Sequence, residues 1–191
     1  MVNWLQVRTL LLALGGNVAG RWGGPRACLV RACCELDKAG IKIVRCSNFY
    51  MTEPLGKGRQ PRYFNAVIMV EPGLAPATLL RLLKCMERRA GRRLGPPMRA
   101  RPLDIDILDY GGRQLGWPPR RRQRGRVILP HPELHTRAFV LVPLREVAPF
   151  WRHPVLGLGA KALLARQPPA ARSGVRQTLD FPSCPCDKAP S

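Results

Sequence analysis

The sequence predicts an α+β fold in which two helices pack on one face of an antiparallel sheet. Segments suited to strands and segments with apolar residues at helical spacing follow one another in the order β-α-β-β-α-β. That order is the ferredoxin-like split βαβ arrangement, a two-layer sandwich. The chain has 191 residues, of which 46% are hydrophobic and 23% charged, so it is long and apolar enough to bury the core of one domain.

The first strand, the first helix and the second strand are predicted within residues 7–50. Residues 7–14 form an apolar run stopped by Gly15-Gly16-Asn17, which is typical of a strand buried on both faces and followed by a turn. Residues 25–39 carry apolar side chains at helical spacing, begin with proline and are followed by glycine, and so predict a helix. Residues 41–50 return to a β-rich composition and predict the second strand.

The remaining three elements follow a loop over residues 52–62 that is rich in proline, glycine and charge. Residues 63–71 predict the third strand, which a Pro-Gly pair ends. Residues 78–90 place apolar side chains on one helical face and predict the second helix. Residues 103–108 alternate apolar and acidic side chains with period two, which is the clearest strand signal in the chain.

The chain is less regular after the fourth strand. In chain order we expect a loop over 111–125, a short strand at 127–129, an irregular or helical return over 134–147 and a last helical turn over 160–166. From Gln167 onward proline, alanine, serine and charged residues dominate, which is typical of a disordered tail. We therefore expect one domain over residues 1–166 and a tail over residues 167–191 that adds nothing to the core.

The chain is strongly basic. It carries 32 Lys and Arg against 12 Asp and Glu, a net charge of +20, and 26 of the cations are arginine. Arginine grips phosphate or carboxylate groups through a planar, bidentate fork. Half of the excess lies between Arg81 and Arg126, where thirteen Arg and one Lys stand against four acids. This segment predicts a polyanionic ligand, either a nucleotide or a nucleic acid.

Cysteine usage and hydropathy bear on the compartment. The seven cysteines have neither the paired spacing of a zinc site nor the density of a secreted disulfide scaffold. Every apolar run is well short of the roughly 18 residues that a membrane span needs. We expect a cytoplasmic, monomeric protein with no membrane contact.

Asp104 and Asp106 are the strongest candidate metal ligands. They are two residues apart in a predicted strand, so both carboxylates project from one face while their apolar neighbours face the core. Like charges so close repel unless a cation lies between them, and Mg²⁺ takes one or two carboxylates together with substrate phosphates. A solvated strand face is the alternative. Arg92, Arg101 and Arg126 are candidates for a clamp on a phosphoryl group beside the metal.

Several enzyme classes are excluded by missing motifs. The Gly-Lys pair at residues 56–57 is followed by Gly58 and not by Ser or Thr, so no P-loop is present. The Gly-x-Ser-x-Gly and His-Glu-x-x-His motifs are also absent. His131 lies between two prolines just after a predicted strand, where it serves either the structure of a rigid turn or donation to a phosphate.

Four motifs lie along the chain in one order. They are LGGN at 14–17, FYMTEPLG at 49–56 continuing as QPRYFNA at 60–66, RPLDIDIL at 101–108, and PHPELHTRAF at 130–139. Together they resemble the 6-hydroxymethyl-7,8-dihydropterin pyrophosphokinase family of folate biosynthesis. The resemblance covers roughly residues 7 to 155, and four motifs in register are far more specific than any one of them.

The resemblance implies a ferredoxin-like fold and transfer of the β,γ-diphosphate of ATP to the hydroxymethyl oxygen of the pterin, giving AMP, with two Mg²⁺ ions. Asp104 and Asp106 match the family's metal ligands. Arg92 and Arg101 match the family's catalytic cations. The residues that match its ATP contacts are Glu87, Arg126, His131 and Arg137. The residues that match its pterin contacts are Thr52, Pro54, Leu55, Tyr63, Asn65 and Phe139. A flat bicyclic ring stacks well between aromatic faces, and an Asn amide can pair with its donors and acceptors. For Tyr63 and Phe139, core packing is the alternative.

Two departures from the family's pattern stand out. The usual basic-x-Gly/Ala-Pro-Arg run before the aspartates is replaced by Pro97-Met98-Arg99-Ala100-Arg101, which alters the loop expected to close over ATP. Gly16 stands where serine is common. Both changes leave the predicted metal ligands in place.

A basic ferredoxin-like nucleic-acid-binding module and a catalytically impaired relative are the alternative functions. The predicted strands lack the aromatic Lys/Arg-Gly-Phe/Tyr run of RNA-binding sheets, and the paired aspartates would repel a phosphate backbone. We therefore expect ATP and a pterin as ligands, and no nucleic-acid partner.

Overall fold

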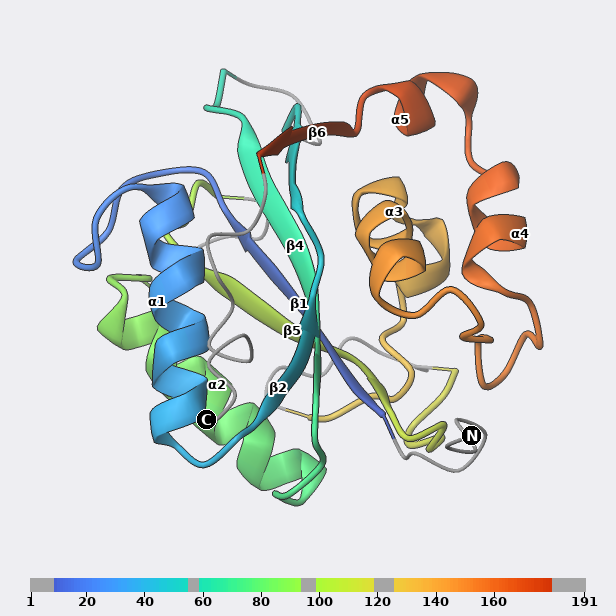
Figure 1. Ribbon diagram of the computed structural model, residues 1–191, viewed down its shortest axis with the longest axis horizontal. Helices are drawn as coiled ribbons and strands as arrows, with labels where there is room; N and C mark the ends of the chain where they lie inside the picture. The colour runs from blue at the N-terminus through green and yellow to red at the C-terminus, as the bar shows by residue number, and fades with distance from the viewer. Residues whose placement is uncertain (1–8, 55–58, 94–98, 119–125, 180–191) are drawn as a thin grey trace, which may run out of the picture.

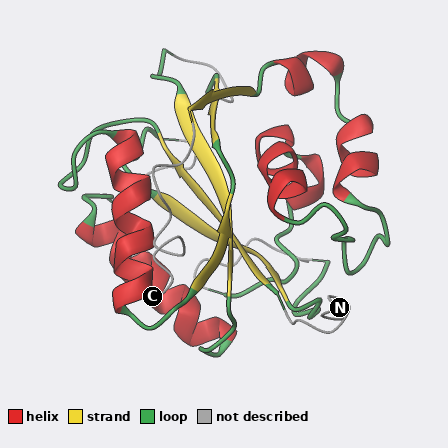
Figure 2. Cartoon of the chain, viewed as in Figure 1, coloured by secondary structure: helices red, strands yellow, loops and turns green. Residues whose placement is uncertain are grey.

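The structure is a computed structural model that describes residues 9–54, 59–93, 99–118 and 126–179. One antiparallel sheet has helices on both faces (Figures 1 and 2). Its strands are β1 (Leu10–Gly16), β2 (Ile43–Cys46), β3 (Phe49–Thr52), β4 (Tyr63–Val70), β5 (Asp104–Tyr110) and β6 (Arg176–Leu179). The helices are α1 (Pro25–Lys38), α2 (Pro76–Arg89), α3 (Ala138–Val147), α4 (Ala160–Ala165) and α5 (Pro169–Ser173), with a 3₁₀ turn η1 (Leu134–Thr136).

The sheet order is β5-β1-β4-β3-β6, and β2 also pairs with β4. The central strands β1 and β4 pair antiparallel from Leu10 opposite Val70 to Gly16 opposite Phe64. They occupy the centre because their side chains are apolar on both faces, as residues 7–14 predicted. β5 lies at one edge of the sheet, beside β1.

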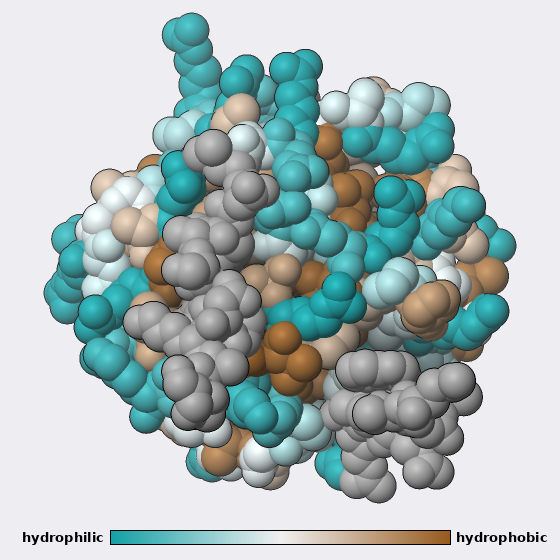
Figure 3. All heavy atoms as spheres, in the orientation of Figure 1, coloured by the Kyte–Doolittle hydropathy of each residue, from teal (hydrophilic) through white to brown (hydrophobic). Residues whose placement is uncertain are grey.

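The sheet separates two apolar cores. Alternate residues of β1 point to opposite faces of the sheet. Leu10, Leu12 and Leu14 pack under α1 and α2, while Leu11 packs under α3. Figure 1 shows α1 and α2 on one face of the sheet and α3 and α4 on the other. The predicted α+β fold with an antiparallel sheet is confirmed, and the second helical layer makes the two-layer sandwich a three-layer one. In the face shown in Figure 3, hydrophilic side chains predominate and hydrophobic ones gather toward the middle.

Two predicted strands differ from the structure. The segment 41–50 contains two strands, because the chain breaks pairing at Ser47, whose N–H donates to Val67 O and whose hydroxyl accepts the N–H of Val67, both at 2.9 Å. The predicted strand at 127–129 is wrong. The segment forms only an isolated bridge, between Leu129 and Leu115, because none of the described strands runs alongside it for hydrogen bonding.

The segment after Gln167 is ordered as far as Leu179, in contrast to the expected tail. It forms α5 and then β6, which pairs antiparallel with β3 and brings Leu179 opposite Phe49. Thr178 adds a hydrogen bond from its hydroxyl to the carbonyl of Phe49 at 3.3 Å. This segment therefore extends the sheet beside β3, and residues 180–191 lie outside the described residues.

No helix in the described part of the chain is long and apolar enough to cross a membrane.

A buried histidine lies on the α3 side of the sheet. The His153 ring is 1% exposed and contacts the rings of His135 and Trp151 edge-on, with centroids 5.7 and 5.9 Å away. Its Nδ1 accepts the N–H groups of Val155 and Leu156, both at 3.2 Å, which assigns the ring proton to Nε2. Burial and, to a lesser degree, His135 lower the pKa of His153 to about 4.

We expect this histidine to make the protein sensitive to acid. The unfolded chain takes up a proton near pH 6.5 and the folded chain only near pH 4, so stability is complete above pH 6.5 and is lost as the pH falls toward 4. The loss in unfolding free energy is at most about 3 kcal/mol. Chemical denaturation at pH 7 and pH 4.5 measures it, and a His153→Gln variant should show a smaller pH dependence. Equal pH dependence in the two proteins would contradict the assignment.

Candidate active site

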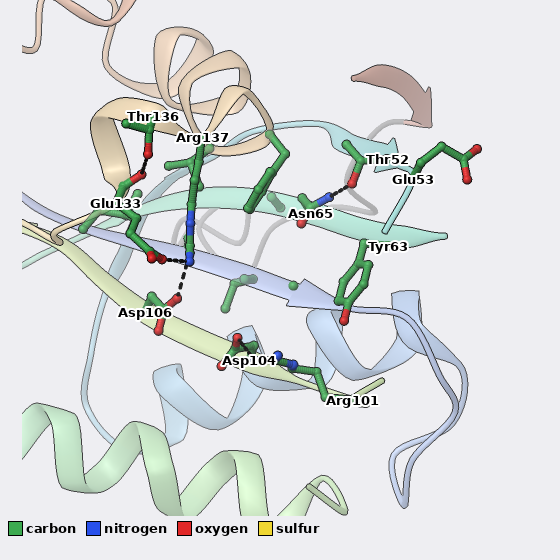
Figure 4. Close-up of a pocket in the computed structure, with 17 residues that line it drawn as sticks. Thr52, Glu53, Tyr63, Asn65, Arg101, Asp104, Asp106, Glu133, Thr136 and Arg137 are labelled. Carbon is green, nitrogen blue, oxygen red and sulfur yellow. Dashed lines mark hydrogen bonds and ion pairs between the residues drawn. The ribbon is translucent and has the colours of Figure 1, made fainter. Parts of the chain in front are cut away.

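A pocket of about 380 Å³ opens on the α3 side of the sheet (Figure 4). Its floor comes from β1, β4 and β5, and its opposite wall from the segment that leads from Glu133 into α3. The polar and aromatic residues that line it are Thr52, Glu53, Tyr63, Asn65, Arg101, Asp104, Asp106, Glu133, Thr136, Arg137 and Phe139. Eight of these eleven are site residues predicted from the sequence, the exceptions being Glu53, Glu133 and Thr136.

β5 places both predicted metal ligands in this pocket. Asp104 and Asp106 point to the same side of the strand, while Ile105 between them is fully buried in the opposite core. Their neighbours on β1 are Gly15, opposite Asp104, and Ala13, opposite Asp106. Since these two residues have almost no side chain, the space in front of the carboxylates stays open.

Cations surround Asp104. Arg101 Nη1 is 2.6 Å from Asp104 Oδ2, Arg92 contacts Oδ1, and Lys84 Nζ is 3.9 Å from Oδ1. Burial would raise the pKa of this carboxyl, but the charges of Arg92, Arg101 and Lys84 outweigh it and hold the pKa at about 2. Asp104 is therefore ionised at neutral pH, as a metal ligand must be.

Asp106 faces a second set of donors. Its Oδ2 is 3.8 Å from both His131 Nε2 and Arg137 Nη1, and its Oδ1 is 4.0 Å from Lys84 Nζ. His131 Nδ1 accepts the N–H of Glu133 at 3.2 Å, which puts the ring proton on Nε2, toward Asp106. Burial lowers the pKa of His131 despite the nearby carboxylates. The neutral ring can thus donate one hydrogen bond toward the pocket at pH 7.

Glu87 lies behind these cations and not in the pocket. It is 2% exposed and accepts hydrogen bonds from Lys84 Nζ at 2.7 Å and from the N–H of Ile105 at 2.8 Å. Arg92 Nη1 is 2.7 Å from its other oxygen. Burial raises its pKa to about 7, although Lys84 and Arg92 oppose the shift. Glu87 thus holds Arg92 and Lys84 in place, while its predicted contact with ATP stays a prediction.

The far end of the pocket carries the predicted pterin contacts. Asn65, 6% exposed, donates from Nδ2 to Thr52 Oγ1 at 2.9 Å, which fixes the plane of its amide (Figure 4). Tyr63 lines the same end, and Phe139 extends from the first turn of α3, with the Arg137 guanidinium 5.6 Å from its ring centroid. Both rings line the cavity, and Phe139 also packs against the apolar core on the α3 side.

Besides Glu87 and Arg92, which form ion pairs behind the pocket, three described residues of the predicted set do not line it. Pro54 is half-buried at the end of β3, Arg126 is exposed, and His131 stands behind Asp106. Leu55 lies outside the described residues, as do Pro97 and Met98 of the altered loop.

Two residues of the site, Lys84 and Asn17, were not predicted from the sequence. Lys84 reaches both aspartates from α2, and its place three residues before Glu87 is the only signal for it. Asn17 is 2% exposed and accepts the N–H of Arg101 on Oδ1 at 2.8 Å, while its Nδ2 donates to Pro61 O at 3.1 Å. Asn17 thus joins the end of β1 to the segment that carries Arg101, and the Gly-Gly-Asn turn was its signal.

The donor set fits a magnesium ion bound with a phosphate ligand. Among the described residues no group of three or more His, Cys, Asp and Glu is arranged for a metal, so Asp104 and Asp106 would be the protein's share of the ligands. Two carboxylates with the remaining positions filled by phosphate and water are the usual pattern for Mg²⁺. The ion pairs to Arg92, Arg101 and Lys84 would then be exchanged in part for contacts between these cations and phosphate.

Comparison with known proteins gives one consistent family. Residues 11–149 match the family model of 7,8-dihydro-6-hydroxymethylpterin-pyrophosphokinase. A 2-amino-4-hydroxy-6-hydroxymethyldihydropteridine pyrophosphokinase of Synechocystis is 37% identical over 153 residues, which are 80% of this chain and 72% of that protein. The enzyme of the same name in Pseudomonas aeruginosa is 35% identical, over 78% of this chain and 85% of its own length.

Solved structures agree on the fold. Wild-type HPPK-DHPS of Plasmodium falciparum superposes with a TM-score of 0.60 at 14% identity, over 83% of this chain. This chain covers 44% of that longer one.

Proposed function

Since the chain belongs to the 7,8-dihydro-6-hydroxymethylpterin-pyrophosphokinase family, we propose that it transfers the diphosphate of ATP to 6-hydroxymethyl-7,8-dihydropterin for folate synthesis. The bond that forms joins the hydroxymethyl oxygen of the pterin to the β-phosphorus. The bond that breaks joins the β-phosphorus to the oxygen bridging to the α-phosphorus, and AMP leaves with that oxygen. The hydroxyl proton passes to solvent. No protein nucleophile is required.

The observation that carries this proposal is the division of one pocket into two chemically different ends. One end holds Asp104 and Asp106 among Arg101, Arg137 and Lys84. The other end holds an oriented Asn amide and two aromatic rings. A charged phosphate chain suits the first end and a flat, polar-edged ring suits the second. The two ends adjoin, so the hydroxymethyl group and the β-phosphorus can meet between them.

The chain's own cations would orient the phosphates. Arg101 and Arg92 present fixed guanidinium forks that can exchange Asp104 for phosphate oxygens, while Arg137 can do so from the opposite wall. Asp104 and Asp106 would hold Mg²⁺, two ions as the family resemblance implies, which when bound supplies neutralisation of phosphate charge. Catalysis would then consist of positioning and electrostatic stabilisation.

The arrangement favours a small ligand over the nucleic-acid alternative. Each cation that borders the two aspartates is already within ion-pair distance of a carboxylate. A nucleic-acid backbone requires a broad surface of uncommitted cations, whereas a nucleotide with Mg²⁺ requires this local balance of both charges.

Formation of AMP by the purified protein tests the proposal. We expect ATP to be converted to AMP only when 6-hydroxymethyl-7,8-dihydropterin and Mg²⁺ are both added, with the pterin diphosphate as co-product. AMP formation that is indifferent to the pterin would refute the proposed acceptor. Binding of ATP without any turnover would instead support the catalytically impaired alternative, with the altered loop before Arg101 as its cause.

Asn65 offers a test of the pterin end alone. Replacing it with alanine removes both the amide and its hydrogen bond to Thr52, so we expect KM for the pterin to rise about 10- to 100-fold while KM for ATP stays the same. Steady-state kinetics with each substrate varied in turn would measure both constants. Asn48→Ala is a matched control, because its side chain is outside the pocket. A rise in KM for ATP as large as that for the pterin would contradict the assignment.

A further inference from the structure

A carboxylate on α3 joins that helix to the edge of β3. Glu146, near the end of α3, accepts the backbone N–H of Asn48 on both oxygens, at 3.0 and 3.1 Å. Its Oε2 also accepts the hydroxyl of Tyr50 at 2.9 Å. Asn48 directly precedes β3 and Tyr50 lies within it. Hydrogen bonds to an ionised acceptor are about twice as strong as neutral ones, so this joint is a firm one.

The two elements that Glu146 joins are the two walls of the pterin end of the pocket. α3 begins at the wall that carries Phe139 and Val140, and β3 ends at Thr52 on the other side. Figure 4 shows α3 above the strands, with Thr52 and Asn65 on the strands beneath it. The distance between these walls decides whether a flat ring fits between them.

A hydrogen-bond path connects the joint to the pterin contact. Tyr50 binds Glu146 through its hydroxyl, and its carbonyl accepts Asn65 Nδ2 at 3.5 Å. The same Nδ2 donates to Thr52 Oγ1 at 2.9 Å, two residues along β3. Asn65 itself lies on β4, and these two hydrogen bonds to β3 orient the plane of its amide.

Neither end of this joint contacts the pocket. Tyr50 and Glu146 are absent from its lining, and Tyr50 is buried. Burial, together with the hydrogen bond to Glu146, raises the pKa of Tyr50 to about 12, so its hydroxyl is protonated and can donate at neutral pH. Any influence on a ligand must pass through Asn65, Thr52 and Phe139.

We propose that Glu146 and Tyr50 are positioning residues that set the separation between Phe139 and Asn65 and so govern affinity for the pterin. This inference rests on the proposed function, because it takes the far end of the pocket as the pterin site. Most of the nucleotide end lies on or beside β5 and α2, which the joint does not touch. Arg137 directly precedes α3, but its ion pairs with Glu133 and Asp106 hold it at the opposite end of that helix from Glu146. Loss of the joint should therefore weaken one ligand and spare the other.

Equilibrium binding to the full chain tests this. The dissociation constant of 6-hydroxymethyl-7,8-dihydropterin is measured by calorimetry with Mg²⁺ and a non-hydrolysable ATP analogue present, and that of the analogue is measured by itself. The variants are Glu146→Ala, Glu146→Gln and Tyr50→Phe. Trp151→Phe is the control, since Trp151 Nε1 donates to Asp109 Oδ2 at 2.8 Å and anchors the segment after α3 in a similar way, away from the pocket.

We expect Glu146→Ala to raise the pterin dissociation constant about tenfold, the cost of losing hydrogen bonds to a charged group, with the constant for the analogue unchanged. Tyr50→Phe should have a smaller effect, and Glu146→Gln, which keeps one acceptor, should lie between wild type and Glu146→Ala. Trp151→Phe should lower the Tm and leave both constants unchanged.

Two results would overturn the inference alone. One is an unchanged pterin constant in a folded Glu146→Ala protein, and the other is equal weakening of pterin and nucleotide. Wild-type protein that binds the nucleotide but not the pterin would overturn the proposed function, and the inference with it.

Discussion

Replacing Asp104 with alanine should abolish turnover while leaving the protein able to bind ATP. The carboxylate is one of two that would hold Mg²⁺, and we expect kcat to fall by a factor of about 10³, which corresponds to about 4 kcal/mol of transition-state stabilisation. Arg92 and Arg101 would lose their partner, so the site would become more positive and metal-free ATP should bind at least as tightly as before.

The separation of the two effects makes this test informative. Steady-state assays give kcat, and equilibrium titration without metal gives ATP affinity. Asp109→Asn is the matched control, because Asp109 lies on the same strand but binds Trp151 and the N–H of Gly112 at the other end. The control should keep wild-type turnover. Near-normal turnover in Asp104→Ala would remove the basis for the metal assignment.

Replacing Arg101 with alanine should have the second-largest effect. Arg101 lines the pocket, and its backbone N–H is held by Asn17, so its guanidinium is a positioned group and not a free surface charge. We expect kcat/KM to fall about 10²- to 10³-fold, in the range found when a preorganised donor is removed from a site of charge development. Arg101→Lys should recover only part of this loss, because lysine keeps the charge but not the fork.

Arg99 provides the control for Arg101. It is exposed, lies two residues away and carries the same charge, but it does not line the pocket. Arg99→Ala should change kcat/KM only slightly, through long-range attraction for ATP that added salt screens. If Arg99→Ala lowered kcat/KM as much as Arg101→Ala, the site would depend on general positive potential and not on hydrogen bonds from the Arg101 guanidinium to phosphate.

The fold could be predicted where a local pattern decided the outcome. The apolar run that ends at Leu14 indicated a strand buried on both faces, and the alternation around Asp104 and Asp106 indicated which side chains leave the core. The irregular or helical return over 134–147 and the helical turn over 160–166 were predicted, but not that they form a second layer on the sheet. α3 contains Pro143 and several β-branched residues, and what holds it is the far face of the sheet, including Leu11 and Val67.

Two short segments differ from the structure that their own composition predicts. Residues 127–129 have the composition of a strand, but a strand needs a partner along its length and Leu115 alone supplies one. The polar segment from Arg176 to Leu179 has little strand signal of its own, yet β3 offers an unpaired edge to which it adds. Tertiary pairing determined both outcomes.

The site residues, too, were predictable only where a local pattern fixed their placement. Two carboxylates that are two residues apart in a strand must point to the same face, so the placement of Asp104 and Asp106 was predictable. Lys84 was not, because a lysine three residues from a glutamate on a helix is the usual pattern of a surface ion pair. Glu87 was assigned to ATP by resemblance, and only its burial beneath Arg92 shows that it supports another residue.

Transfer of labelled phosphorus tests the central claim most directly. ATP labelled at the β-phosphorus or at the γ-phosphorus is incubated with the protein, Mg²⁺ and 6-hydroxymethyl-7,8-dihydropterin, and the products are separated. The account predicts that either label appears in the pterin product and that the nucleotide product is unlabelled AMP. A β-label retained in ADP, with only the γ-label transferred, would contradict the account.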